Sequence, residues 1–220
     1  MKTITRIFAA LLFVSTLHAQ SSECTRTVGF GDVEICLPQL EGMQECYEYP
    51  AVKVLADATE APMNEVLGYY LTGDTYEERD RLTEVVFDDY LKFYGTTQVS
   101  TYPIPRSELG TMQEMVGDQF SGAIQEMSQK VVEQSFENLE IGKPELLDNY
   151  KINDDSFTLI AVVVYSIGEI KSTMIMSING MILANRLVWM AYYLDYDGEE
   201  SVKAIKAKTK VIVDATMAVN

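Results

Sequence analysis

Histidine is almost absent from this sequence, because His18 is the only copy in 220 residues. Histidine is the usual general base near neutral pH and the commonest metal ligand in proteins. Beyond residue 18 the chain therefore excludes Ser-His-Asp and Cys-His mechanisms and any zinc site that needs imidazole. The glycine-rich nucleotide-binding patterns and the Gly-x-Ser-x-Gly nucleophile pattern are also missing. We therefore predict no catalytic residue, no cofactor-binding residue and no metal ligand.

Basic residues are scarce as well. The chain has 17 lysines and arginines against 33 aspartates and glutamates, a formal net charge of −16. Nucleic acids are bound through clusters of lysine and arginine that neutralise phosphates, so we expect no nucleic acid partner. A basic partner, a divalent cation or solubility alone would each be compatible with such an acidic chain, and solubility alone is sufficient to account for it.

Long apolar runs of the kind that span a bilayer are missing from the start of the chain. Two basic residues there precede a short apolar run, Ile7 to Val14, which falls well below the ~20 residues that a membrane helix needs. This pattern is typical of a secretory signal peptide. We predict a signal peptide at residues 1–19, cut after Ala19 or Gln20, and a single domain over residues 20–220. The expected location is periplasmic or secreted.

Cleavage would remove two of the 17 basic residues and no acidic one, which leaves 15 against 33 and a formal net charge of −18. The run from Met174 to Leu194 has the length of a membrane span. However, Asn179, Asn185 and Arg186 would then lie near the centre of the bilayer, which is unfavourable by a few kcal/mol. We therefore expect no membrane span in the mature chain.

Three cysteines, Cys24, Cys36 and Cys46, lie close together near the start of the mature chain. In an oxidising compartment two of them would pair and one thiol would remain. A Cys36–Cys46 bond would join the end of the first strand to the turn after Gly42, whereas Cys24–Cys36 would attach the mature start to that strand. A buried structural role is the commonest one for the remaining thiol, and no Cys-x-x-Cys pair indicates a redox site.

Apolar strands near the C-terminus organise the fold. We predict strands at Phe157 to Ser166, Glu169 to about Ala184 and Leu187 to Tyr193, followed by an amphipathic helix from Gly198 to the end. The first strand has apolar side chains at both alternating positions, so both of its faces are expected to be covered. We predict an α/β (α+β) fold in which a mostly antiparallel sheet carries helices on both faces, as a three-layer sandwich.

The turn between the last two strands has two candidate positions. Asn179-Gly180 is a favoured hairpin dipeptide and would leave a long strand after it, whereas Asn185-Arg186 leaves a bulged strand ahead of the turn. We favour Asn185-Arg186. A further turn is predicted at residues 153–155, after an extended segment at residues 145–152.

The sequence of the first half of the chain predicts shorter strands and helices. We expect one edge strand or a short hairpin at Thr27 to Leu37, a helix from Pro50 that stops by Pro62, and strands at Val66 to Leu71 and Thr83 to Tyr94. Thr72 to Arg81 is charged and rich in turn residues, so we interpret it as an exposed connection.

A long helix is predicted in the middle of the chain. Thr111 and Glu114 have the spacing of a capping box at a helix start. Apolar residues then follow at three- and four-residue spacing as far as Val131, so one face of this helix is expected to pack on the sheet.

Clustered acids and abundant tyrosines are the only leads toward chemistry. None of the acidic clusters fits an EF-hand loop, and tyrosines most often lie half-buried in sheets, although they can line a ligand groove. The clusters are Asp74 with Glu77, Glu78 and Asp80; Asp88 with Asp89; and Asp195 with Asp197, Glu199 and Glu200. The tyrosines in or beside predicted strands and turns are Tyr47, Tyr49, Tyr69, Tyr70, Tyr90, Tyr94, Tyr192, Tyr193 and Tyr196.

The end of the chain also resembles a known family. From Phe157 to Asn220 it has a meander of apolar strands, an Asn-Arg turn, the aromatic strand Leu187 to Tyr193, an acidic break and a closing amphipathic helix. This order resembles the end of Mog1/PsbP-like domains. The resemblance implies a three-layer α/β/α sandwich and a non-catalytic domain that binds or helps to assemble other proteins, and it transfers no binding residue.

The sequence therefore predicts an exported, non-catalytic binding or accessory protein of the bacterial cell envelope, with another envelope protein as the expected partner. Two alternatives remain open. One is a carboxylate-dependent hydrolase, which requires two acids in one cleft, one of them with a pKa raised by burial. The other is a structural protein that binds a divalent cation through its acidic clusters.

Overall fold

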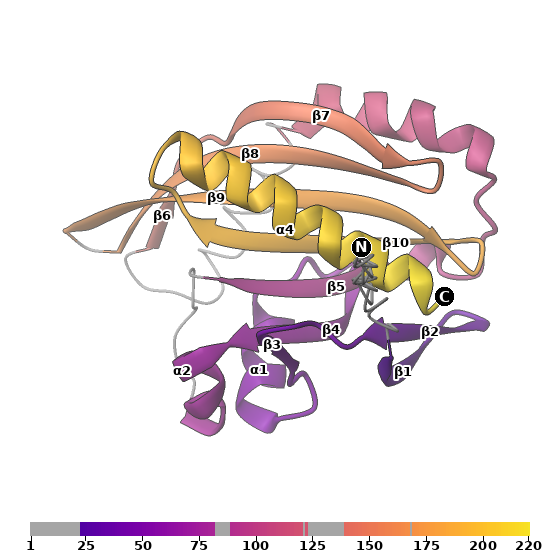
Figure 1. Ribbon diagram of the computed structural model, residues 1–220, viewed down its shortest axis with the longest axis horizontal. Coiled ribbons are helices and arrows are strands. Elements are labelled where there is room, and N and C mark those ends of the chain that lie inside the picture. Colours follow the sequence, from indigo (N-terminus) through magenta and orange to yellow (C-terminus); the bar gives the residue numbers. More distant parts are fainter. Residues whose placement is uncertain (1–22, 82–88, 121, 123–138, 168) are drawn as a thin grey trace, which may run out of the picture.

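The computed structural model describes residues 23–81, 89–120, 122, 139–167 and 169–220 (Figure 1). Within these residues, eight strands form one antiparallel sheet. The strands are β3 (Met43–Glu45), β4 (Asn64–Thr72), β5 (Tyr90–Thr96), β6 (Leu139–Ile141), β7 (Glu145–Asn153), β8 (Ser156–Ile167), β9 (Ile170–Leu183) and β10 (Arg186–Asp195). Their order is β3-β4-β5-β10-β9-β8, and both β6 and β7 pair with β8 at the last edge. The predicted mixed fold with an antiparallel sheet is confirmed.

The predicted meander forms the centre of this sheet, because β8 pairs with β9 and β9 with β10 along nearly their whole lengths. Alternate side chains of β8 enter two different apolar clusters. Phe157 and Leu159 belong to one cluster, while Ile160 belongs to the other. Both faces of the strand are therefore buried, which explains why its sequence shows no alternation between apolar and polar residues.

The turn between β9 and β10 lies at Ala184-Asn185, one residue earlier than predicted. Both residues have positive φ angles, 46° and 60°, and Arg186 pairs with Leu183 as the first residue of β10. Two successive left-handed residues match the twist of a tight hairpin. The rejected alternative, Asn179-Gly180, lies inside β9 and pairs with β10.

Gly180 allows β8 and β9 to pack closely and is not part of a turn. A Cβ atom there would lie 2.6 Å from ring atoms of Phe157 on the neighbouring strand. We expect Gly180→Ala to lower the free energy of unfolding by roughly 1–3 kcal/mol, because the buried ring must shift. Gly29→Ala is the matched control, since a Cβ at Gly29 would meet no atom within 4 Å. Urea unfolding followed by circular dichroism measures both, and equal effects of the two substitutions would contradict this packing.

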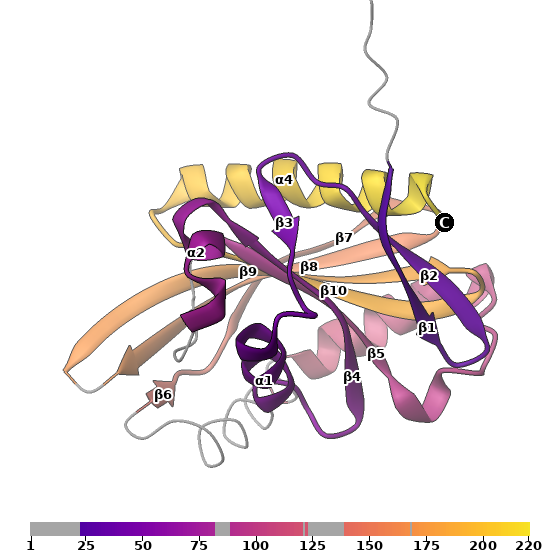
Figure 2. The same ribbon diagram turned by 90° about the horizontal axis from the view of Figure 1, so that it is seen from below.

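The closing helix, α4 (Glu199–Ala218), begins after Gly198, whose φ of 81° lies in the left-handed region. It packs against β8, β9 and β10, and its buried Ile205, Ile212 and Val213 lie in the same apolar cluster as Ile160. Figure 2 shows α4 running along one side of the sheet. The predicted amphipathic helix is confirmed, and its acidic first turn suits the positive end of the helix dipole.

The middle helix begins earlier than predicted. A 3-10 turn, η3 (Arg106–Glu108), follows Pro105 and continues directly into helical residues 109–120, so Thr111 lies inside the helix and the capping-box prediction was wrong. Pro105 is the extended residue just before the first helical turn, so the free backbone amides of the helix start lie there and not at Thr111. Leu109 and Phe120 are buried in the cluster that contains Phe157. The predicted continuation of this helix, 123–131, lies outside the described residues.

The first part of the chain forms a separate hairpin and one edge of the main sheet. β1 (Cys24–Phe30) and β2 (Val33–Pro38) make a two-stranded sheet, so the hairpin alternative is correct. The helix predicted from Pro50 is present as α1 (Pro50–Ala58).

Two other predictions for this region need correction or restriction. The connection after β4 contains two short helices, α2 (Gly73–Glu77) and η1 (Arg79–Arg81), where only turns were expected. Arg79 packs against the rings of Tyr49 and Tyr76, and these contacts order the connection. The strand predicted over 83–94 corresponds to β5 only from Tyr90 onward, since 82–88 lie outside the described residues.

Candidate functional site

Five segments that are far apart in the sequence meet at one end of the main sheet. They are the β1–β2 tip at 31–32, residues 97–106, the β7–β8 turn at 154–155, the β9–β10 turn at 184–185, and Asn220 after α4. We call this region the loop end, and it lies at the right in Figure 1. Backbone and ion-pair contacts join the segments, since Ile104 N donates to Asn185 O at 2.9 Å and Arg186 pairs with Asp32.

A cavity of about 580 Å³ opens at the loop end, a volume within the range of ligand-binding pockets. Its lining combines three apolar side chains, from β9 and α4, with one arginine, two aspartates, three asparagines and an alanine. The lining residues are Arg106, Asn153, Asp154, Asp155, Ile182, Leu183, Ala184, Asn185, Met217 and Asn220.

Two arginine–aspartate pairs lie at the loop end. Arg186 donates from Nε and Nη2 to Asp32 Oδ1 at 3.2 and 2.6 Å, and this hydrogen bonding lowers the pKa of the exposed Asp32 carboxyl below its ordinary value. In the second pair, Arg106 Nε contacts Asp155 Oδ1, an atom that is shielded from solvent. Arginine is well suited to such sites because its planar group matches a carboxylate.

The other polar groups around the cavity differ in whether they have hydrogen-bond partners. The side-chain oxygen of Asn153 accepts hydrogen bonds from Asp155 N and Ser156 Oγ, both at 2.9 Å. The backbone oxygen of Asn185 accepts from Ile104 N and from Arg186. Asp154 is exposed and has no hydrogen-bond or ion-pair partner in the part of the chain that the structure describes. The cavity therefore offers a carboxylate that remains available.

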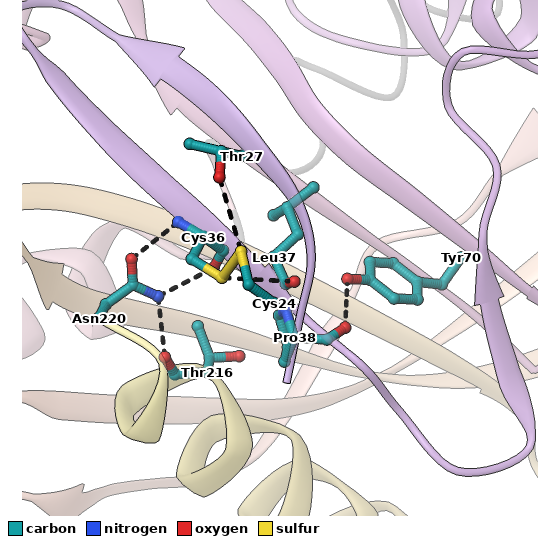
Figure 3. Close-up of a disulfide and its surroundings, with 8 residues drawn as sticks. All are labelled: Cys24, Thr27, Cys36, Leu37, Pro38, Tyr70, Thr216 and Asn220. Atoms are coloured by element: carbon teal, nitrogen blue, oxygen red, sulfur yellow. Dashed lines mark hydrogen bonds between the residues drawn. A yellow bond between two sulfur atoms is a disulfide. The ribbon is translucent and has the colours of Figure 1, made fainter. Parts of the chain in front are cut away.

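A disulfide joins the two strands of the β1–β2 hairpin, next to the C-terminal residue Asn220. Cys24 and Cys36 are bonded, which resolves the alternatives left open by the sequence, and they join β1 to β2 (Figure 3). The side chain of Asn220 accepts a hydrogen bond from Cys36 N and donates to Cys36 O, both at 2.9 Å. It also donates to Thr216 O on α4. Asn220 thus connects the cavity, the disulfide and the last turn of α4.

The remaining cysteine, Cys46, is a buried free thiol that donates to Tyr69 O at 3.3 Å. Burial raises its pKa to about 12. A thiol that remains protonated is a poor nucleophile, so this position suits the buried structural role expected for the third cysteine.

Three of the tyrosines highlighted by the sequence pack on one another. Tyr90 stacks between Tyr69 and Tyr193, at ring separations of 5.4 and 4.5 Å. Next to them, Lys92 and Glu60 form an ion pair with Nζ and Oε2 2.6 Å apart, and their side chains are only 9% and 3% exposed. These rings and charges lie in the protein interior, which is the common role of sheet tyrosines.

The acidic clusters do not assemble a metal centre in the described part of the chain, where no group of three or more suitable side chains converges. Asp89 instead accepts a hydrogen bond from Tyr192 and pairs with Lys208 on α4. Asp88 lies outside the described residues. The described carboxyls with a resolved pKa shift, Glu60 and Asp32, are both shifted downward, opposite to the shift that the hydrolase alternative requires.

Sequence reasoning predicted the turns at 153–155 and 185–186 but assigned no binding role to them. The residues of the loop end carry one weak signal, namely asparagines and aspartates in short turns of an otherwise apolar meander. Turns of this kind are surface features, and binding residues are often found on such loops. Arg106 had no signal, because its role depends on Asp155, which lies 49 positions later in the chain.

No protein-family model matches the sequence, and no curated protein matches it. The comparison with solved structures matches the Ran-binding protein Mog1p of Saccharomyces cerevisiae at 11% identity, covering 84% of this chain and 86% of that chain, with a TM-score of 0.33. This matched protein carries the name of the Mog1/PsbP-like group that the end of the sequence resembles. None of the helices in the described residues is long and apolar enough to cross a membrane.

Proposed function

We propose that this chain is an exported, non-catalytic binding or accessory protein of the bacterial cell envelope that docks a partner protein through the loop end. The observation that carries the proposal is the exposure of Val99 and Tyr102, which are 38% and 67% exposed, on the segment that leads to the cavity. Tyrosine is enriched at protein interfaces, because it combines a large apolar face with a polar tip. An exposed aromatic on a segment whose last residue, Arg106, lines a partly apolar cavity suits contact with a partner protein.

Two features support export. The first 19 residues have the charge and apolar pattern of a signal peptide. The Cys24–Cys36 bond is of a kind that persists in oxidising compartments and is rare in the cytosol. Together they favour a mature chain that begins near residue 20 and acts in the periplasm or outside the cell.

The proposed domain is a single three-layer unit. α4 supplies apolar side chains to the cluster on one side of β8, and helical residues 109–120 supply Leu109 and Phe120 to the cluster on the other side. Because a helix lies on each face of the proposed sandwich, the cavity opens at the end of the sheet, in the loop end. Neither the hydrolase nor the cation-binding alternative has a comparable supporting observation among the described residues.

Site-specific photo-crosslinking tests the docking surface. We expect benzoylphenylalanine at position 102 of the full chain, in the native cells, to give a discrete adduct with a partner protein, because Tyr102 lies at the loop end. The matched control is position 211, because Val211 is 61% exposed on α4. The mass of the captured chain reports whether residues 1–19 have been removed. An equal adduct yield at both positions, or none at position 102, would overturn the proposal.

A further inference from the structure

The lining of the loop-end cavity combines apolar side chains with carboxylates. Ile182 and Met217 contribute apolar surface, while Asp154 and Asp155 contribute carboxylates. Long cationic side chains bury an apolar stem and keep a charged end near polar groups. The combination of an apolar wall with two aspartates therefore matches the shape and charge of an arginine or lysine side chain.

The protein already places a guanidinium on one of these carboxylates. Arg106 contacts Asp155 from a side chain that is 74% exposed, whereas the Arg186 side chain, paired with Asp32, is only 8% exposed. The Asp155 oxygen that Arg106 contacts is shielded from solvent, so this carboxylate needs a cation beside it. The exposed Arg106 side chain can move aside when an incoming cation takes its place on Asp155, because the carboxylate then stays paired, while the buried Arg186 remains bound to Asp32.

Charge favours the same class of partner. The chain carries a formal net charge of −16, and Asp154 has no partner among the residues that the structure describes. Complementary charge raises the rate at which partners meet and selects against partners of the same sign. Tyr102, on the adjoining segment, offers an apolar face for a neighbouring residue of the partner.

We infer that the loop-end cavity binds an arginine or lysine side chain of a basic segment in the partner protein. The stem lies along Ile182 and Met217, and the charged end is held by Asp154 and by Asp155, from which it displaces Arg106. This inference rests on the proposed function, since it specifies the chemistry of the partner that docks at the loop end.

Titration with two small probes tests the inference. N-acetyl-arginine amide is expected to cause saturable changes in the amide NMR signals of residues 153–155, 184–185 and 220 of the mature protein. N-acetyl-citrulline amide has nearly the same shape without the charge, and we expect it to bind at least about tenfold more weakly, because a charge-assisted hydrogen bond is lost. Equal binding of the two probes, or arginine-dependent changes spread over all exposed acids, would overturn the inference.

A charge-removing variant localises the effect. Asp154→Asn is expected to weaken binding of the arginine probe by about tenfold, since it removes the available carboxylate from an exposed turn. The matched control is Asp195→Asn, an exposed aspartate at the other end of β10, which should bind the probe as the unmodified protein does. Equal effects of the two substitutions would also overturn the inference. If position 102 crosslinks to a partner but the arginine probe does not bind, the docking function is supported and only the preference for a cationic side chain is contradicted.

Discussion

Lys92→Met is expected to lower the free energy of unfolding at pH 7 by about 3–5 kcal/mol. Lys92 lies in the middle of β5, and its Nζ is 2.6 Å from Oε2 of Glu60, just after α1. The Glu60 side chain is only 3% exposed, so removing the lysine leaves a carboxylate in the interior without its compensating charge. Chemical denaturation followed by circular dichroism measures the loss.

Two comparisons separate this effect from the loss of any ion pair. Lys203→Met removes the partner of Glu200 on the surface of α4, where both side chains are well exposed, and should change stability by less than about 1 kcal/mol. A double variant with Lys92→Met and Glu60→Leu should recover much of the stability, because two apolar side chains leave no buried charge. A loss for Lys92→Met no greater than that for Lys203→Met would contradict a buried pair.

The stability that the Glu60–Lys92 pair contributes should depend on pH, in a direction that follows from the pKa shifts of the two groups. Burial alone would raise the pKa of Glu60, but the charge of Lys92 and hydrogen bonds from Asn64 and Ala61 outweigh it and lower the pKa. Burial would lower the pKa of Lys92, but the charge of Glu60 outweighs it and raises the pKa.

The contribution of Glu60 is therefore present above its ordinary pKa of 4.5 and is lost as pH falls through the lowered value. The contribution of Lys92 is present below its ordinary pKa of 10.5 and is lost as pH rises through the raised value. The difference in unfolding free energy between the unmodified protein and Lys92→Met should therefore be greatest between pH 4.5 and pH 10.5. It should become smaller at more acidic and at more alkaline pH.

Removing the disulfide is the second change with a large expected effect. The double variant Cys24→Ser, Cys36→Ser should lose about 3 kcal/mol of unfolding free energy, because the bond closes a short loop in the unfolded chain and restricts its freedom. The two cysteines are 12 positions apart. The bond also holds Cys36 where Asn220 pairs with its backbone, so the hairpin should loosen from α4.

Reductant provides the control for this prediction. Dithiothreitol should lower the melting temperature of the unmodified protein and of Cys46→Ala, since both retain the Cys24–Cys36 bond. It should leave the melting temperature of the double variant unchanged. If reductant acts equally on all three proteins, the measured loss does not come from this disulfide.

The parts of the fold that the sequence predicted well are those determined by local patterns. β8, β9 and β10 match the predicted strands to within one or two residues at each end, because long apolar segments and short turns are encoded by neighbouring residues. The closing helix follows from its own periodicity. The errors are local as well: a proline-led 3-10 turn replaced the expected capping box at Thr111, and the hairpin turn falls one residue earlier.

The sequence by itself thus determined the strand meander, the closing helix and the exclusion of histidine chemistry, because composition and period depend on no distant contact. Only the tertiary structure decided which groups meet. Glu60 reaches Lys92, Asn220 reaches Cys36, and Arg106 reaches Asp155 through the order of strands in the sheet. Such contacts depend on strand pairing between remote segments, which a single sequence does not encode in any local period. The loop end is therefore a property of the folded chain.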